Sequence, residues 1–233
     1  MRRLFVTSSA ILIPARWGSS RYTGKPLCKL GDLHMIQHVY RACKESGIDT
    51  YVLTDYPLVA DLFADDTVLL DTKTNYQNGT ERCAGALTDS RFDKYDTFIN
   101  VQGDMPDVTT EMIEKCLFSL KHYPVTTVYT KMPENKQFDL NTVKIILAGD
   151  QVLWCGRGFK GYGEWHLGVY GYRRNALEIY PSLIVEPEER IEQLEQLRWL
   201  KNGWQIGCLS VQYNGVEINT PEDVEEWHKQ NSQ

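Results

Sequence analysis

Residues 13–27 form the segment whose residue types are best suited to chemistry. It contains three cations and three residues that let a ligand approach the backbone closely, namely Arg16, Arg21, Lys25, Gly18, Ser19 and Gly24. Such a loop suits a polyphosphate, because the cations offset its charge while backbone N–H groups and hydroxyls donate hydrogen bonds. The segment is neither a P-loop nor a Gly-x-Gly-x-x-Gly dinucleotide motif. Taken alone, the same residues also fit a solvated basic loop.

Two further segments carry polar residues where a strand ends or a helix begins. Residues 100–106 read Asn-Val-Gln-Gly-Asp-Met-Pro, so Asp104 follows a predicted strand. A carboxylate there is well placed to hold a hard cation such as Mg²⁺ against phosphate oxygens, although a turn or helix cap also fits Asp104 taken alone. Residues 78–82 read Asn-Gly-Thr-Glu-Arg and combine a turn, a cap and a cation at a predicted helix start.

The first half of the chain predicts a scaffold that brings these segments together. Short apolar runs alternate with longer amphipathic stretches, which is typical of βα units on a mostly parallel sheet. We predict strands at residues 10–14, 50–54, 67–70, 97–101 and 125–130, and helices near 35–45, 58–64, 80–87 and 109–121. The segment at 13–27 then follows the first strand, at the carboxyl end where open α/β sheets bind their ligands.

The second half predicts an added antiparallel lobe at about residues 141–185. It reads as a hairpin of strands 143–147 and 151–155, followed by a strand at 166–172. Then come one strong helix at 188–201, a strand at 206–211 and a last helix that begins at Thr220 and Pro221. Because no Pro, Gly or Ser-rich linker separates the halves, we predict a single domain over residues 1–233.

Composition excludes several classes of protein. The chain has 233 residues with 25 Lys and Arg against 31 Asp and Glu, a formal net charge of −6 that argues against a nucleic-acid partner. Its six cysteines show no Cys-x-x-Cys pair and no zinc-ligand spacing, so we expect reduced thiols in a cytoplasmic protein. No run approaches the roughly 18 apolar residues of a membrane span, so we expect no membrane partner and no targeting segment.

Read together with four other segments, these motifs resemble the 3-deoxy-manno-octulosonate (Kdo) cytidylyltransferases, also called CMP-Kdo synthetases. The matching segments are IPARWGSSRYTGKPL at 13–27, NGTER at 78–82, NVQGDMP at 100–106, NTVK at 141–144, HLGVYGYR at 166–173, LEQLR at 194–198 and GVEINTPED at 215–223. The resemblance extends over almost the whole chain. GKPL, HLGVYGYR and LEQLR favour the Kdo branch over the related sialic-acid cytidylyltransferases.

The resemblance implies a fold and a reaction. The fold is the Rossmann-like nucleotide-diphospho-sugar transferase fold, a mixed and mostly parallel sheet flanked by helices, in which the lobe at about 141–185 acts as a lid or in dimerisation. The reaction transfers CMP from CTP to the anomeric hydroxyl of Kdo or its 8-amino analogue, releases pyrophosphate, requires Mg²⁺ and activates a sugar for lipopolysaccharide. A cytoplasmic homodimer is implied as well.

The resemblance also implies residue roles. Nucleotide-binding residues are Ala15, Arg16, Ser19, Arg21, Lys25, Gln77 and Thr80, and sugar-binding residues are Arg82, Gln102, Arg157, His166, Tyr170, Glu195 and Gln196. The metal ligands are Asp104 and Asn219, and the residues implied in catalysis are Arg16, Lys25, Arg82 and Asp104. Without the resemblance, His166 and Tyr170 also fit a core strand, and Glu195 and Gln196 also fit a solvated helix face.

The chain departs from the family pattern in three places. Asn219 stands where the family has a metal-binding Asp, Met105 stands where it usually has Glu, and the segment between Arg157 and His166 is shorter than in typical members. A neutral amide attracts Mg²⁺ less than a carboxylate does, so we expect weakened metal affinity. The alternatives are an enzyme for another 2-keto-3-deoxy sugar acid and a catalytically impaired nucleotide-binding paralogue.

Overall fold

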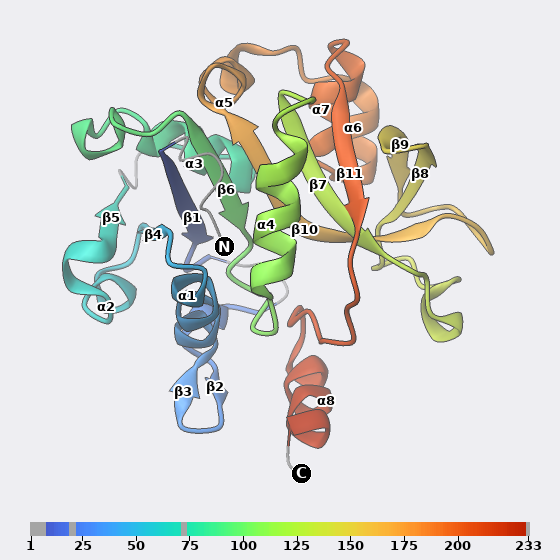
Figure 1. Ribbon diagram of the computed structural model, residues 1–233. Helices are drawn as coiled ribbons and strands as arrows, with labels where there is room; N and C mark the ends of the chain where they lie inside the picture. The colour runs from blue at the N-terminus through green and yellow to red at the C-terminus, as the bar shows by residue number, and fades with distance from the viewer. Residues whose placement is uncertain (1–7, 19–21, 71–73, 232–233) are drawn as a thin grey trace, which may run out of the picture. The chain divides into compact units, whose positions relative to one another are not determined.

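The computed structural model describes residues 8–18, 22–70 and 74–231 (Figure 1). The chain divides into two compact units. Unit 1 comprises Met1–Thr110 and Asn214–Gln233, and unit 2 comprises Glu111–Tyr213. The predicted lobe at 141–185 falls within unit 2.

Unit 1 is built on four parallel strands. They lie in the order β5 (Thr67–Leu69), β4 (Asp49–Thr54), β1 (Ser9–Ala15) and β6 (Thr97–Val101). All four are confirmed predictions, with ends shifted by at most a residue. Residues 10–13 of β1 are consecutive and fully buried, which means that both faces of the strand are covered.

The helices of unit 1 follow the predicted order. They are α1 (Met35–Glu45), α2 (Pro57–Ala60), α3 (Gly79–Ala86) and α8 (Pro221–Asn231). Short 3-10 turns η1 (Lys25–Leu27), η2 (Ala64–Asp66) and η3 (Ser90–Phe92) and the two-stranded ribbon β2 (Lys29–Leu30) and β3 (Leu33–His34) complete the unit. Helix α8 begins as predicted, because Asp223 Oδ2 accepts a hydrogen bond from the N–H of Thr220 at 2.7 Å.

Unit 2 combines parallel and antiparallel pairing. Its strands lie in the order β10 (Glu164–Arg173), β7 (Val125–Thr130), β11 (Ile206–Ser210), β9 (Gln151–Gly156) and β8 (Lys144–Ala148), with a further pairing of β10 to β8. Only β7 and β11 pair in parallel within this unit. Its helices are α4 (Thr110–Ser119), α5 (Arg174–Ile179), α6 (Pro187–Glu192) and α7 (Gln196–Lys201), with 3-10 turns η4 (Glu134–Lys136) and η5 (Tyr180–Ser182). The predicted α/β class with an antiparallel element is confirmed.

The single helix predicted at 188–201 is wrong, because the chain breaks between α6 and α7. Gln193 adopts the left-handed conformation with φ of 52°, which ends α6. Side chains from elsewhere in unit 2 bond to the backbone on both sides of the break. The Glu192 carbonyl at the end of α6 accepts from Nε of Arg157 at 3.2 Å. The Glu195 carbonyl at the start of α7 accepts from the Arg198 N–H at 3.2 Å and also from the Tyr180 hydroxyl at 3.0 Å. These contacts stabilise a break that helical periodicity does not predict.

Candidate active site

Three parallel strands of unit 1, β1, β4 and β6, end at the same edge, and polar residues follow each of them. Arg16 comes directly after β1 and is exposed. Asp55 comes directly after β4, and its Oδ1 accepts a hydrogen bond from the backbone N–H of Trp17 at 3.1 Å. The other oxygen of Asp55 lies 3.4 Å from Nη1 of Arg82, which is buried. Asp55 therefore links the ends of β1 and β4 to helix α3.

Lys25 and Asp104 form an ion pair at this edge. The distance from Nζ to Oδ2 is 2.7 Å, and the side chains are 14% and 29% exposed, so solvent and ligands can reach both. Gly24 has φ of 73°, and a Cβ there would lie 3.0 Å from the Trp17 ring. Trp17 in turn stacks on Tyr56 with centroids 3.9 Å apart. This close packing fixes the backbone from which Lys25 reaches Asp104.

The start of α3 is capped and packs closely against Gln102. Asn78 Oδ1 accepts from the N–H of Glu81 at 2.9 Å, and Glu81 Oε2 accepts from the N–H of Gln77 at 2.8 Å. A Cβ at Gly79 would lie 2.9 Å from Nε2 of Gln102. A larger residue at position 79 would therefore make the Gln102 amide shift.

The other predicted nucleotide-binding residues differ in their surroundings. Ala15 and Thr80 are buried, whereas Gln77 is exposed. Ser19 and Arg21 lie outside the described residues. The nucleotide-binding roles of all these residues stay predictions.

The backbone places Asn219 beside Asp104. The N–H of Ile218 donates to the Asp104 carbonyl at 2.9 Å, so the residue that follows it is next to the predicted metal ligand. Asp223 uses its carboxylate to cap α8 and also accepts from the N–H of Asn219 at 2.7 Å. Among the described residues, no group of three or more His, Cys, Asp or Glu side chains is arranged to hold a metal.

The predicted sugar-binding residues of unit 2 form one cluster. The rings of His166 and Tyr170 lie 5.4 Å apart, although residues four apart on a regular strand are separated by about 13 Å. An irregularity in the pairing of β10 with β7, between Leu167 and Tyr170, shortens the separation. The Tyr170 hydroxyl donates to Oε1 of Gln196 at 3.3 Å. Burial, followed by the charge of Glu195, raises the pKa of Tyr170 well above its ordinary value.

Arg157 is anchored beside this cluster. Its backbone N–H donates to Oε2 of Glu192 at 2.8 Å, and its guanidinium donates to the carbonyls of Glu192 and Asn141. The buried Lys144 donates from Nζ to the carbonyl of Arg157 at 3.1 Å. The structure therefore brings together the predicted sugar-binding residues of unit 2, whereas Arg82 and Gln102 belong to unit 1.

His166 is neutral in the folded protein. Burial, with a smaller contribution from the charge of Arg157, lowers its pKa from 6.5 to about 3. Thr127 has a single hydroxyl proton, which it donates to the Val169 carbonyl at 2.8 Å. Thr127 Oγ1 therefore accepts from Nε2 of His166 at 3.0 Å. This tautomer leaves Nδ1 of His166 without a proton, so that atom is a hydrogen-bond acceptor.

The neutral state of His166 predicts a pH dependence of stability. Below pH 6.5 the unfolded chain binds a proton at His166 that the folded chain does not bind, so the free energy of unfolding decreases as the pH falls toward 3. The slope from this group approaches about 1.4 kcal/mol per pH unit. Urea unfolding between about pH 5 and 6.5, above the carboxylate range, measures it. His166→Gln is expected to have a shallower slope, and an identical slope would contradict the assignment.

A buried ion pair connects α6 and α7 beside the cluster. Arg198 donates from Nη2 to Oε1 of Glu189 at 2.6 Å and from Nε to Oε2 at 2.9 Å, and both side chains are buried. The guanidinium carbon also lies 4.3 Å from the Tyr180 ring centroid. These contacts hold α7, and with it Gln196, against α6.

Breaking this pair is expected to cost far more stability than breaking an exposed pair on the same helices. Arg198→Met leaves the buried Glu189 carboxyl group without its partner, so the free energy of unfolding should fall by about 3–5 kcal/mol. Lys201→Met, which breaks the exposed pair with Glu188, is the matched control and should have little effect. Urea unfolding measures both. Equal losses in the two variants would contradict the role of the buried pair.

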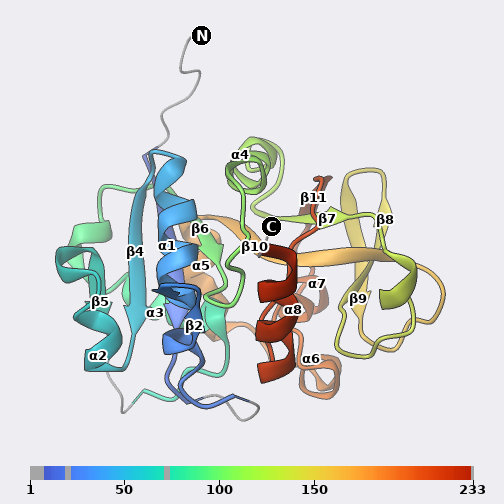
Figure 2. The ribbon, with the colours of Figure 1, turned by 90° about the horizontal axis from the view of Figure 1, so that it is seen from below.

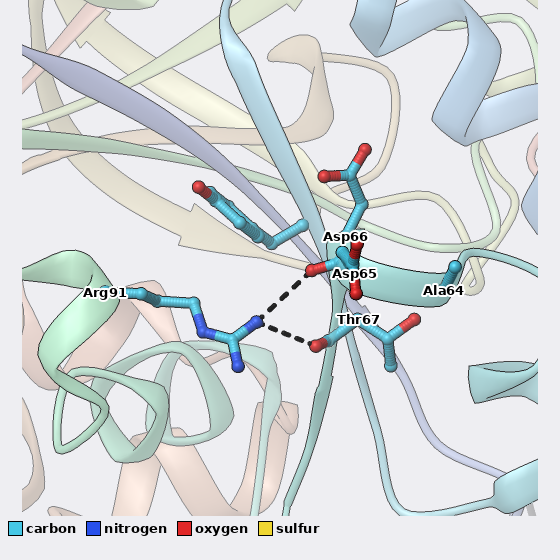
Figure 3. Close-up of a pocket in the computed structure, with 6 residues that line it drawn as sticks. Ala64, Asp65, Asp66, Thr67 and Arg91 are labelled. Carbon is cyan, nitrogen blue, oxygen red and sulfur yellow. Dashed lines mark hydrogen bonds between the residues drawn. The ribbon is translucent and has the colours of Figure 1, made fainter.

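A surface hollow elsewhere in unit 1 is separate from these residues (Figure 3). Its lining includes Tyr51, Asp65, Asp66 and Arg91, and Arg91 donates to the carbonyls of Asp65 and Thr67 at 3.3 and 3.0 Å. Thr67 begins β5, so the hollow lies toward the amino end of a strand whose parallel neighbours carry the candidate site at their carboxyl ends. None of the predicted site residues lines it.

Comparison with known proteins assigns the family. The family model described as Cytidylyltransferase matches residues 10–206. The chain belongs to the cytidylyltransferase family. It is therefore a CTP-dependent nucleotidyltransferase. No helix in the described part of this cytidylyltransferase is long and apolar enough to cross a membrane.

Curated relatives of this cytidylyltransferase include enzymes for two sugar acids. A 3-deoxy-manno-octulosonate cytidylyltransferase of Zea mays is 33% identical over 92% of this chain and 78% of its own length. The 3-deoxy-manno-octulosonate cytidylyltransferase of Fusobacterium nucleatum is 30% identical over 92% of this chain and 93% of its own length. An 8-amino-3,8-dideoxy-manno-octulosonate cytidylyltransferase of Shewanella piezotolerans is 33% identical over 92% and 94%.

Solved structures confirm the fold. CMP:2-keto-3-deoxy-manno-octonic acid synthetase, complexed with CTP, is similar with a TM-score of 0.85 and 30% identity over 97% of this chain and 98% of the other. A glucose-1-phosphate thymidylyltransferase of Bacillus anthracis shares the fold alone, with a TM-score of 0.69 and 13% identity over 95% and 94%. The predicted nucleotidyltransferase fold is thus confirmed.

Three residues that shape the site were not predicted from the sequence. Asp55 had a usable signal, because a carboxylate directly follows the predicted strand 50–54. Thr127 lies within a run of buried residues on β7, and no pattern in the sequence indicates its hydrogen bond to His166. Glu189 lies on a helix rich in charges, and only its burial distinguishes it.

Proposed function

We propose that this cytidylyltransferase transfers CMP from CTP to the anomeric hydroxyl of Kdo or of its 8-amino analogue. The proposal that the acceptor is a sugar acid rests on the unit 2 cluster of His166, Tyr170 and Gln196, with Arg157 beside it. Neutral hydrogen-bonding groups match sugar hydroxyls, and a guanidinium matches a carboxylate. The names of the curated relatives support both sugars.

The proposed reaction joins two anions. The anomeric oxygen of the sugar attacks the α-phosphorus of CTP, a new P–O bond forms and the bond to pyrophosphate breaks. The proton of the anomeric hydroxyl passes to solvent or to the departing pyrophosphate. The protein must screen the repulsion and stabilise charge on the transferring phosphoryl group. Arg16, Lys25 and Arg82 are the unit 1 cations proposed for this task. On unit 2, Nδ1 of neutral His166 accepts from a sugar hydroxyl.

We also propose Mg²⁺ as the metal, held by Asp104 and Asn219. The donor set fits, because Mg²⁺ is usually bound by one or two protein oxygens and completes its octahedral shell with substrate phosphates and water. Asp104 is reachable from solvent, and the backbone bond of Ile218 places Asn219 beside it. Bound there, the metal would supply charge neutralisation for the triphosphate.

A cytoplasmic homodimer that supplies an activated sugar for lipopolysaccharide is part of the same proposal. Large apolar side chains of unit 2 are exposed, including Phe138 at 66%, Leu140 at 59% and Tyr162 at 59%. Such side chains would be covered if this part of unit 2 lay in a subunit interface. Sedimentation velocity at micromolar concentration should find a dimer, and a monomer would argue against this part of the proposal.

Pyrophosphate release with a panel of 2-keto-3-deoxy sugar acids tests the proposed substrate. The assay contains CTP and Mg²⁺, and each sugar acid is compared by kcat/KM. We expect Kdo or 8-amino-Kdo to exceed the others. Preference for another sugar acid would show that Kdo and 8-amino-Kdo are not the substrates. CTP binding without pyrophosphate release with any sugar acid would favour a catalytically impaired paralogue.

A further inference from the structure

Asp107 ties two parts of the C-terminal segment of unit 1 to the turn after β6. Its Oδ2 accepts from the backbone N–H of Val216 at 2.9 Å, and its Oδ1 accepts from Nε1 of Trp227 at 2.8 Å. Hydrogen bonds to a carboxylate are stronger than those between neutral groups. Val216 precedes Asn219 and Trp227 follows it, so one carboxylate holds both sides of the candidate metal ligand.

The stretch between Val216 and Asn219 runs along the turn that carries Asp104. The N–H of Val216 bonds to the Asp107 side chain, and the N–H of Ile218 bonds to the Asp104 carbonyl at 2.9 Å. Attachments two residues apart leave the backbone little freedom to turn between them. They place Asn219 directly after a fixed point beside Asp104.

Apolar packing reinforces the same attachment. Leu30, Met35, Val216, Ile218 and Trp227 form one buried cluster, which joins helices α1 and α8 through the β2–β3 ribbon. Figure 2 shows α8, in red, on the side of unit 1 that carries this ribbon. The cluster buries the Trp227 ring while its Nε1 reaches Asp107, so packing and hydrogen bonding act on the same side chain.

We propose that Asp107 is a positioning residue that holds Asn219 beside Asp104 for the divalent cation, acting through Val216 and Trp227. The proposal rests on the proposed function. A neutral amide oxygen attracts a hard cation weakly, so its value as a ligand depends on being held in place before the metal arrives. Asp107 would provide that positioning through its bonds to Val216 and Trp227, without being a ligand itself.

Binding of Mn²⁺ in the presence of CTP, without sugar acid, tests the proposal. The electron paramagnetic resonance signal of free Mn²⁺ gives the affinity. Asp107→Ala and Trp227→Phe should each weaken Mn²⁺ binding roughly three- to tenfold, the effect of losing a partly buried hydrogen bond to a carboxylate. The double variant should bind Mn²⁺ no more weakly than Asp107→Ala does, because both changes act through one carboxylate. Asn219→Asp should strengthen binding.

Asp93→Ala is the matched control, because it removes the same charge from an exposed position in unit 1. It should leave the Mn²⁺ affinity unchanged. If Asp107→Ala fails to fold, Trp227→Phe carries the test, since it removes one donor and keeps an aromatic ring.

Three outcomes would overturn the proposal. Unchanged Mn²⁺ affinity in folded Asp107→Ala and Trp227→Phe would show that Asp107 is only structural. Equal weakening by Asp93→Ala would show an effect of net charge. In both cases the unsubstituted chain still binds Mn²⁺, so the proposed function stands. If the unsubstituted chain shows no CTP-dependent Mn²⁺ binding, the metal part of the proposed function fails together with this inference.

Discussion

Replacing Asp104 by asparagine is expected to lower kcat/KM for pyrophosphate release by about 10³-fold. Two effects combine in this loss. The variant removes the negative charge that would hold Mg²⁺ at unit 1, and it leaves Lys25 without the carboxylate that lies 2.7 Å from its Nζ. The variant should keep its fold, because Asn and Asp have nearly the same shape and the Ile218 bond uses the backbone of residue 104.

Magnesium dependence separates the two effects of Asp104→Asn. If the lost charge mainly weakens the binding of Mg²⁺, a high Mg²⁺ concentration should restore part of the rate. The matched control is Asp66→Asn, which breaks another Lys and Asp pair of unit 1, that of Lys44 at 3.3 Å. That pair is on the surface, so the control should keep its kcat/KM. An active Asp104→Asn enzyme with an unchanged Mg²⁺ requirement would show that Asp104 is not a metal ligand.

Replacing Arg16 by alanine is expected to cost about 2–4 kcal/mol of transition-state stabilisation, or roughly 10²- to 10³-fold in kcat/KM. Arg16 is exposed directly after β1, at the edge where parallel strands present ligand-binding residues. Its guanidinium would make a charge-assisted contact with the triphosphate, and alanine cannot replace it.

The measurement for Arg16→Ala is the steady-state rate as a function of CTP concentration. Because the lost group is a cation and not a metal ligand, added Mg²⁺ should not restore the rate, in contrast to Asp104→Asn. Arg41→Ala, an exposed arginine of α1, removes the same charge and should behave as the unsubstituted enzyme. An unchanged kcat/KM for CTP in Arg16→Ala would show that the triphosphate is bound elsewhere.

The core of unit 1 could be predicted because its strands are continuous apolar runs that are buried on both faces. Residues 10–13 are the clearest case, since burial on both faces removes the polar alternation of a surface strand. Asp104 follows the end of β6, whereas Lys25 lies further along the segment after β1, and their ion pair shows that the two segments meet. Their roles in binding and catalysis stay predictions.

Features that depend on long-range contacts could not be predicted. Helical spacing continues through Gln193, and the contacts of Arg157 and Tyr180 with the carbonyls of Glu192 and Glu195 on either side of the break come from distant parts of the sequence. The ring contact between His166 and Tyr170 depends on an irregular pairing of β10 with β7. The bonds from Asp107 to Val216 and Trp227 cross more than 100 residues of sequence, a separation over which periodicity carries no information.

Identification of the products formed from CTP and Kdo in the presence of Mg²⁺ tests whether this enzyme transfers CMP to that sugar acid. ³¹P nuclear magnetic resonance follows the α-phosphorus of CTP as it is transferred, and mass spectrometry identifies the sugar nucleotide. We expect equimolar pyrophosphate and CMP-Kdo, or the 8-amino product with that sugar, and about a 10³-fold slower formation of both with Asp104→Asn. Binding of CTP that yields neither product with either sugar acid would contradict it.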